Sequence, residues 1–140
     1  MKRTDFSVDW LFAACAPDTE LLPWNAQFTP VDLPHDWQIR HADDLYRDGT
    51  LFYRKYFFVT DVPGTRRMLW FGGAYMDTTV FVNGTEVGQW KYGYTSFWFD
   101  ITDALHEGQN EVLVRCNLRH PNSRWYSGAG LYRNVELWEA

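Results

Sequence analysis

Apolar and polar residues alternate along much of the chain, and no long stretch keeps the spacing of an amphipathic helix. Alternation with a period of two puts successive side chains on opposite faces of a strand. The pattern is clearest in residues 78–90, where Asn83-Gly84 separates two such runs. This dipeptide is preferred in two-residue type I′ turns, because both central residues adopt a positive φ. We therefore predict a β-hairpin in which Val80 faces Val87. Its core-facing residues are Val80, Val82 and Val87.

The same alternation predicts further strands at 6–12, 52–60, 67–75, 96–101, 112–117 and 134–138, with a short one at 37–39. Apolar parity predicts these core-facing residues: Phe97, Phe99, Ile101, Val112, Val114, Cys116, Val135 and Leu137. The runs 52–60 and 67–75 are aromatic on both faces, so their inward face stays open. Residues 100–105 fit one helical turn, and the proline-containing stretch 14–50 is expected to be mostly loop.

Many short strands joined by turns predict an all-β fold, an antiparallel β-sandwich such as a jelly roll. At 140 residues the chain is expected to form a single domain, 1–140. The last residues, VELWEA, form a strand that runs into the C-terminus. This is expected of a domain cut from a longer chain, and also of a terminal strand docked in a sheet.

Composition excludes several functions. The net charge is -5 with acidic and basic residues intermixed, so we expect no nucleic-acid partner. No segment approaches the ~20 apolar residues of a membrane span or resembles a signal peptide, so we expect no membrane partner and a cytoplasmic location. Cys15 and Cys116 are expected to be small buried hydrophobes rather than a disulfide. Aromatic residues make up 19% of the chain, which suggests that some of them face a ligand or another domain.

A search for catalytic groups assigns none. Glycoside hydrolysis commonly uses two carboxylates, but the candidates in the loops fit turn and cap positions better. Those candidates are Asp36, Asp43, Asp44 and Asp48. Ser127 lacks the G-x-S-x-G setting of a hydrolase nucleophile, and residues 128–130 lack the Lys-Ser/Thr of a phosphate loop. The histidines lack ligand spacing, so we predict no metal and no cofactor and place these residues at the surface: His35, His41, His106 and His120.

The stretch RHPNSRWYSGAGLYR (119–133) is the best candidate for binding. Aromatic rings can stack on the C–H faces of a sugar, while amide and guanidinium groups bind its hydroxyls. The candidate sugar-binding residues are Asn122, Arg124, Trp125 and Tyr126. An equally weighted alternative is that the two aromatics pack against a neighbouring domain while Arg124 pairs with an acid.

Several motifs in order give the chain a resemblance to a family. They are LPHDW (33–37), FYRKYF (52–57), FGGAYMDTTVFVNGTEVG (71–88), GYTSFWFDIT (93–102), GQNEVLVR (108–115) and SRWYSGAGLYRNVEL (123–137). Together they resemble the N-terminal sugar-binding domain of glycoside hydrolase family two, which includes β-galactosidases and β-glucuronidases. LPHDW resembles the β-galactosidase-like branch. The resemblance implies a jelly roll of the galactose-binding-domain-like type.

The resemblance also implies what this chain lacks and what it contacts. In the family, two glutamates of a following (β/α)₈ barrel carry out a retaining reaction, and 140 residues cannot hold that barrel beside a sandwich. The implied partners are a β-galactoside-like carbohydrate and the following immunoglobulin-like and barrel domains. HPNSRWYSGAG (120–130) matches a loop at the barrel rim, although it has no acid between Arg119 and Arg133.

The expected function is therefore a non-catalytic domain that helps shape the active-site rim of a β-glycosidase, with no activity of its own. Two alternatives stay open. One is a stand-alone carbohydrate-binding module or lectin-like protein, which would use the same aromatics without a barrel. The other is a purely structural domain whose tryptophans are buried against its neighbours.

Overall fold

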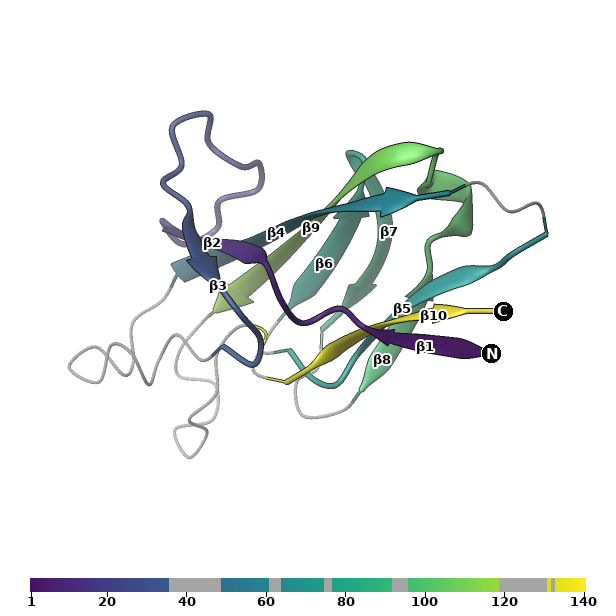
Figure 1. Ribbon diagram of the computed structural model, residues 1–140. Coiled ribbons are helices and arrows are strands. Elements are labelled where there is room, and N and C mark those ends of the chain that lie inside the picture. Colours follow the sequence, from purple (N-terminus) through teal and green to yellow (C-terminus); the bar gives the residue numbers. More distant parts are fainter. Residues whose placement is uncertain (36–48, 61–63, 75–76, 92–95, 119–130, 132) are drawn as a thin grey trace.

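The computed structural model describes residues 1–35, 49–60, 64–74, 77–91, 96–118, 131 and 133–140. These residues form strands and one short 3₁₀ turn, Thr102–Ala104, which confirms the helical turn expected within 100–105. The strands are β1 (Lys2–Asp5), β2 (Trp10–Cys15), β3 (Thr29–Val31), β4 (Gly49–Val59), β5 (Arg67–Phe71), β6 (Thr78–Val82), β7 (Thr85–Trp90), β8 (Phe97–Asp100), β9 (Gly108–Leu118) and β10 (Val135–Glu139) (Figure 1). No helix among the described residues is long and apolar enough to cross a membrane.

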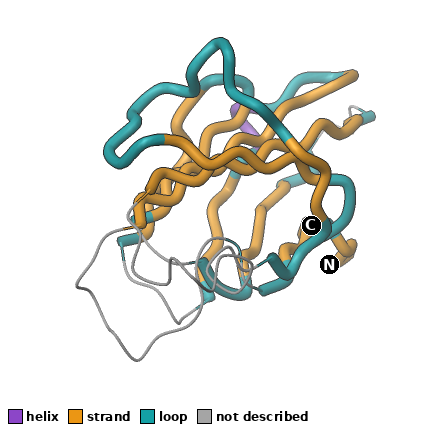
Figure 2. Tube along the Cα trace, turned by 90° about the vertical axis from the view of Figure 1, so that its left-hand side faces the viewer, coloured by secondary structure: helices purple, strands orange, loops and turns teal. Residues whose placement is uncertain are grey.

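The strands make two antiparallel sheets. A four-stranded sheet has the order β1-β10-β5-β8, and a six-stranded sheet has the order β3-β2-β4-β9-β6-β7. The sheets stack as two layers, and the chain ends lie together because β1 pairs with β10 (Figures 1 and 2). The predicted all-β sandwich of jelly-roll type is confirmed.

The core lies between the two sheets and contains the residues that alternation directed inward. On β9, Val112, Val114 and Cys116 are fully buried. Phe97, Ile101 and Val135 are also buried, while Phe99, Val87 and Leu137 are partly buried and pack against the core. Both cysteines are free thiols. Cys116 is buried as expected, but Cys15 is partly exposed, so its predicted burial is wrong.

The hairpin of β6 and β7 has the predicted turn but a different register. Asn83 and Gly84 both have positive φ, 51° and 82°, as a type I′ turn requires. Beyond the turn, Val80 pairs with Gly88 rather than with Val87, because a β-bulge adds a residue to β7. The predicted Val80–Val87 pair is therefore wrong.

The strand predicted at 6–12 is also wrong as one strand. Asp5 ends β1 in the four-stranded sheet, and Trp10 begins β2 in the six-stranded sheet, so residues 6–9 cross between the layers. Phe6 and Trp10 both enter the core at this crossing, and the Trp10 Nε1–H donates to the Phe6 carbonyl at 2.7 Å. Phe6 and Trp10 are an even number of residues apart, so their burial gives the same apolar spacing as one continuous strand would. The strand predicted at 37–39 lies outside the described residues.

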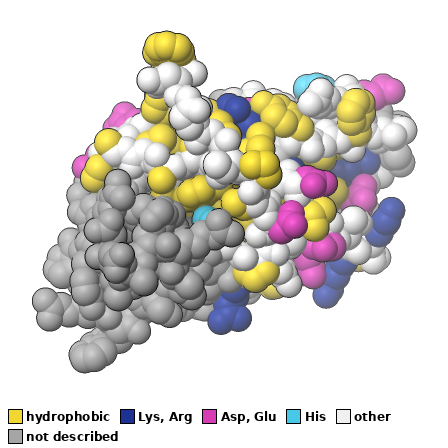
Figure 3. Space-filling view, turned by 60° about the vertical axis from the view of Figure 1, so that its left-hand side comes forward, with side chains coloured by type: hydrophobic (Ala, Val, Ile, Leu, Met, Phe, Trp, Pro, Cys, Tyr) yellow, Lys and Arg dark blue, Asp and Glu magenta, His cyan; other side chains and the backbone are white. Residues whose placement is uncertain are grey.

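Charged and apolar side chains are interspersed over the described surface that is seen in Figure 3. Acidic and basic groups lie close together there rather than in separate fields. This surface agrees with the mixed charge pattern along the chain.

Candidate functional site

The predicted sugar-binding residues belong to a segment that the structure does not describe. Asn122, Arg124, Trp125 and Tyr126 all lie within 119–130, outside the described residues. Its described neighbours are Leu118, at the end of β9, and Leu131, which is fully buried. The structure therefore shows where the segment is attached.

Leu131 is joined to the LPHDW motif by a backbone hydrogen bond. The His35 N–H donates to the Leu131 carbonyl at 2.8 Å. Residues 36–48 begin directly after His35, and residues 119–130 end directly before Leu131. Two of the motifs that carry the family resemblance thus meet at one point of the fold.

The His35 side chain is part of the core at this junction. It is buried, with Nδ1 2.7 Å from the Tyr53 hydroxyl of β4, and the Phe12 ring packs against both rings. The prediction of a surface position is wrong for His35. The apolar Leu33 lies two residues before His35, but the partner Tyr53 is 18 residues away, so the local pattern could not assign the burial of His35.

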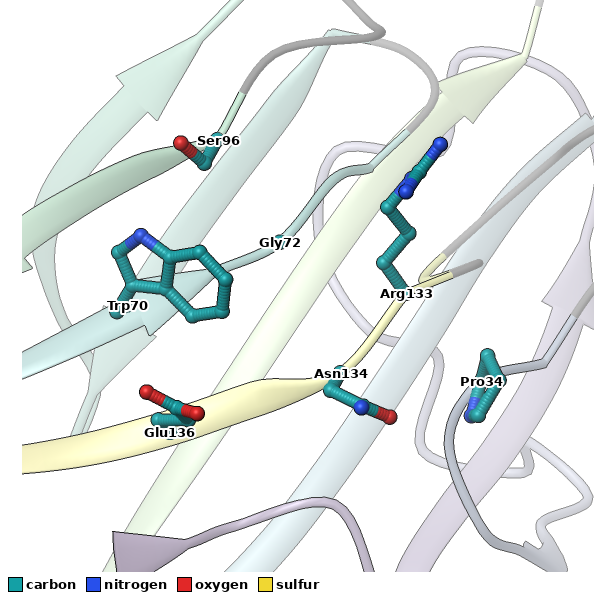
Figure 4. Close-up of a pocket in the computed structure, with 7 residues that line it drawn as sticks. All are labelled: Pro34, Trp70, Gly72, Ser96, Arg133, Asn134 and Glu136. Carbon is teal, nitrogen blue, oxygen red and sulfur yellow. The ribbon is translucent and has the colours of Figure 1, made fainter. Parts of the chain in front are cut away.

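A hollow lies beside this junction, on the outer face of the four-stranded sheet. Its volume is about 740 Å³. Its lining residues come from the ends of β5, β8 and β10 and from the LPHDW motif: Pro34, Trp70, Gly72, Ser96, Arg133, Asn134 and Glu136 (Figure 4). The hollow adjoins Leu131 through Arg133, so it lies next to the attachment of the predicted loop.

Strand parity explains which side chains reach the hollow. Leu69 and Phe71 of β5 point into the core and are fully buried, so Trp70 between them points outward. Val135 of β10 likewise points inward, and Glu136 points outward. Trp70 and Glu136 are direct cross-strand partners. One aromatic ring and one carboxylate therefore lie next to each other at the hollow.

Gly72 lets the end of β5 lie close to the approach to β10. Its N–H donates to the Asn134 carbonyl at 2.9 Å. A Cβ at this position would lie 3.1 Å from both the Arg133 Cβ and the Asn134 carbonyl oxygen, closer than nearly all such contacts. Because Gly72 has no side chain, Asn134 and Arg133 can lie close to it at the edge of the hollow.

Three tryptophans extend from the hollow across the sheet. Trp70 stacks on Trp138 of β10 with ring centroids 5.9 Å apart and planes 9° apart. Trp98 of β8 is the cross-strand partner of Trp70 and is 56% exposed. The Trp138 Nε1–H donates to Glu136 Oε1 at 2.8 Å, and the Arg3 guanidinium lies 4.5 Å from the Trp138 ring. We call Trp70, Trp98 and Trp138 the outer tryptophan face.

These groups suit the binding of a neutral polyhydroxylated ligand. Aromatic faces can stack on sugar C–H groups, and carboxylate, amide and hydroxyl groups can bind sugar hydroxyls. Glu136 is the single carboxylate among the described residues that line the hollow, whereas glycoside hydrolysis commonly uses two. Among the described residues, no group of three His, Cys, Asp or Glu lies close enough to hold a metal ion. The hollow can bind, but it lacks the pair of acids for hydrolysis.

Comparison with known proteins identifies the family. The sequence model described as "Glycosyl hydrolases family 2, sugar binding domain" matches residues 23–140. The chain belongs to this family. It is the sugar-binding domain of a family 2 glycosidase, as the ordered motifs indicated.

Relatives of this glycosyl hydrolase family 2 domain are named either as β-galactosidases or as β-glucuronidases. A β-galactosidase of Bacteroides ovatus is 38% identical over 97% of this chain, and a putative β-glucuronidase of Formosa agariphila is 36% identical over 98%. The crystal structure of a family 2 member from Bacteroides cellulosilyticus covers all of the chain with a TM-score of 0.82 and 31% identity. The chain spans 18% and 15% of the two curated relatives and 21% of the crystallised chain. The matched region is thus a small part of much larger proteins.

Proposed function

We propose that this domain serves a retaining β-glycosidase of the β-galactosidase-like branch, and that residues 119–130 help form a sugar subsite that a (β/α)₈ barrel completes. The observation that carries the proposal is the ordered set of family motifs, which includes LPHDW and SRWYSGAGLYRNVEL. A β-galactosidase and a putative β-glucuronidase are similarly close, at 38% and 36% identity, so the proposed branch rests on LPHDW.

The geometry supports a binding role rather than chemistry. The buried junction of His35 and Leu131 fixes the point from which the 119–130 segment is presented. Rigid support of this kind lowers the entropy cost of ordering a binding loop on its ligand. Within that segment we propose that Trp125 and Tyr126 stack on the sugar, and that Asn122 and Arg124 bind its hydroxyls.

The proposed partners are the carbohydrate and the domains of the parent enzyme. The catalytic glutamates would come from the barrel, with an immunoglobulin-like domain between the barrel and this one. This domain would then contribute through substrate positioning, which affects kcat/KM without supplying a reacting group.

Trp125→Ala in the parent enzyme tests the proposal. We expect kcat/KM for an aryl β-galactoside to fall by about tenfold or more, because a stacking surface is lost from the subsite. Steady-state kinetics and the thermal unfolding midpoint are measured together on purified enzyme. We expect the unfolding midpoint to change little.

Trp24→Ala is the matched control. Trp24 is 97% exposed and lies between β2 and β3, so its removal should leave both quantities unchanged. If Trp125→Ala lowers the yield of folded enzyme but leaves kcat/KM per folded molecule intact, Trp125 is a packing residue and the proposal for the loop is wrong.

A further inference from the structure

The outer tryptophan face needs an explanation that the fold does not supply. The core between the sheets does not include it, since Leu69, Phe71 and Val135 point inward from β5 and β10 and are already buried. Trp98 nevertheless exposes 56% of its surface on the outer side of the sheet. Trp70 and Trp138 beside it are partly exposed, and apolar surface of this kind on a soluble protein marks a binding surface.

Polar groups surround the aromatic surface at the hollow. Figure 4 shows the Trp70 ring between Ser96 on one side and Glu136 on the other, with Asn134 and Arg133 across from it. The Trp138 indole holds Glu136 by a 2.8 Å hydrogen bond to Oε1. The carboxylate is therefore oriented before any ligand arrives, which reduces the cost of binding.

We infer that this hollow is a carbohydrate-binding site of the domain itself, in which Trp70 stacks on a neutral pyranoside and Glu136 accepts hydrogen bonds from its hydroxyls. Trp98, the neighbour of Trp70 on β8, extends the stacking surface beyond the edge of the hollow. Asn134 and Ser96 bind further hydroxyls at the rim. The volume of 740 Å³ lies within the roughly 300–1,000 Å³ of small-ligand sites. A mono- or disaccharide is of that size.

The chemistry favours a sugar over a protein surface as the occupant. The cores of protein–protein interfaces are depleted in glutamate, whereas Glu136 lines this hollow together with Ser96 and Asn134. The ligand class rests on the proposed function, but the site is carried by residues outside the 119–130 segment and can fail separately.

The test is an NMR titration of the ¹⁵N-labelled 140-residue chain with lactose, following the indole N–H signals. We expect saturable shifts of the Trp70 and Trp98 signals. Trp98→Ala and Glu136→Gln should each weaken lactose binding by about tenfold, since stacking and charge-assisted hydrogen bonds contribute on that scale. Trp24→Ala is the control and should bind as the unchanged chain does.

The variants are chosen so that folding does not confuse the outcome. Trp98 is exposed, and glutamine keeps an oxygen that can accept from Trp138, so each backbone spectrum should match that of the parent chain. Trp70→Phe, which keeps a ring at the stacking position, should bind more weakly than the unchanged chain but more tightly than Trp98→Ala.

Two results would overturn the inference. One is the absence of saturable shifts up to the solubility of lactose. The other is binding that persists in Trp98→Ala and Glu136→Gln but is lost in Trp125→Ala. That second result would place the sugar on the 119–130 segment. It would support the proposed function and contradict the proposal that the hollow binds sugar.

Discussion

Individual aromatic residues in this chain serve two different purposes. Trp10 is fully buried, and its indole N–H is satisfied by the Phe6 carbonyl, so it is a core residue. Trp98 and Trp24 are largely exposed. The composition predicted a surplus of aromatics beyond the needs of the core. It could not say which indoles were surplus, because a tryptophan fits a core or a wet surface equally well.

The two cysteines give a prediction at this scale. Burial is the main cause that raises the pKa of Cys116, to about 12, and burial also raises the pKa of Cys15. The thiolate is the reactive form, so Cys116 stays almost entirely protonated and unreactive at pH 8. We expect N-ethylmaleimide to modify Cys15 in the native protein and Cys116 only after unfolding.

Mass spectrometry of the modified protein checks this expectation. One adduct, mapped to Cys15, should form under native conditions, and a second should form in denaturant. Equal rates at both sites without denaturant would mean that Cys116 is not enclosed between the sheets.

At the scale of elements, local patterns predicted strands well and their pairing less well. Alternation found β6, β8, β9 and β10 with the correct inward faces. It could not reveal the bulge in β7, because a bulge is a feature of how two strands pair, which alternation along one strand does not report. It also could not assign the face of β5, whose residues are apolar on both sides. The order of strands in the sheets could not be predicted either, because β5 pairs with β8 and β10, which are distant from it in sequence.

For the hollow, too, the sequence predicted which way some side chains point but not which strands lie side by side. The parity of β10 placed Glu136 and Asn134 opposite the core, as the structure has them. Trp70 could not be assigned from its own strand, and its neighbours Ser96 and Arg133 reach it only through the pairing of β5 with β8 and β10. The predicted binding segment, 119–130, lies outside the described residues, so its side chains stay a prediction.

Gly88 tests the close approach of β7 to the Phe99 ring of β8. A Cβ at this position would lie 2.3 Å from the Phe99 ring, so alanine must displace Phe99 or the strand. We expect Gly88→Ala to lower the free energy of unfolding by about 1–3 kcal/mol, the usual cost of overpacking. Chemical denaturation measures it.

Glu86→Ala on the same strand is the control, because Glu86 is exposed and its replacement should change stability by less than about 0.5 kcal/mol. If both variants unfold at the same denaturant concentration, then Gly88 is not required for the close approach of β7 and Phe99.

At the scale of the whole molecule, the described residues form a two-sheet sandwich that carries polar and aromatic groups on one outer face. Its sheets meet in one core, and the family match covers residues 23–140. The sequence motifs predicted this architecture and family because they recur in order along almost the whole chain. They could not predict the outer tryptophan face, which is made only when β5, β8 and β10 pair.

The most direct test of the account is saturation-transfer NMR on the purified 140-residue chain with an aryl β-galactoside, with the substrate signals followed over time. The account predicts transfer from protein to the sugar ring protons while the substrate stays intact. It would be contradicted by release of the aryl group that a point change within these residues abolishes, since the chain would then be catalytic. Absence of any transfer would contradict the claim that the domain binds sugar by itself.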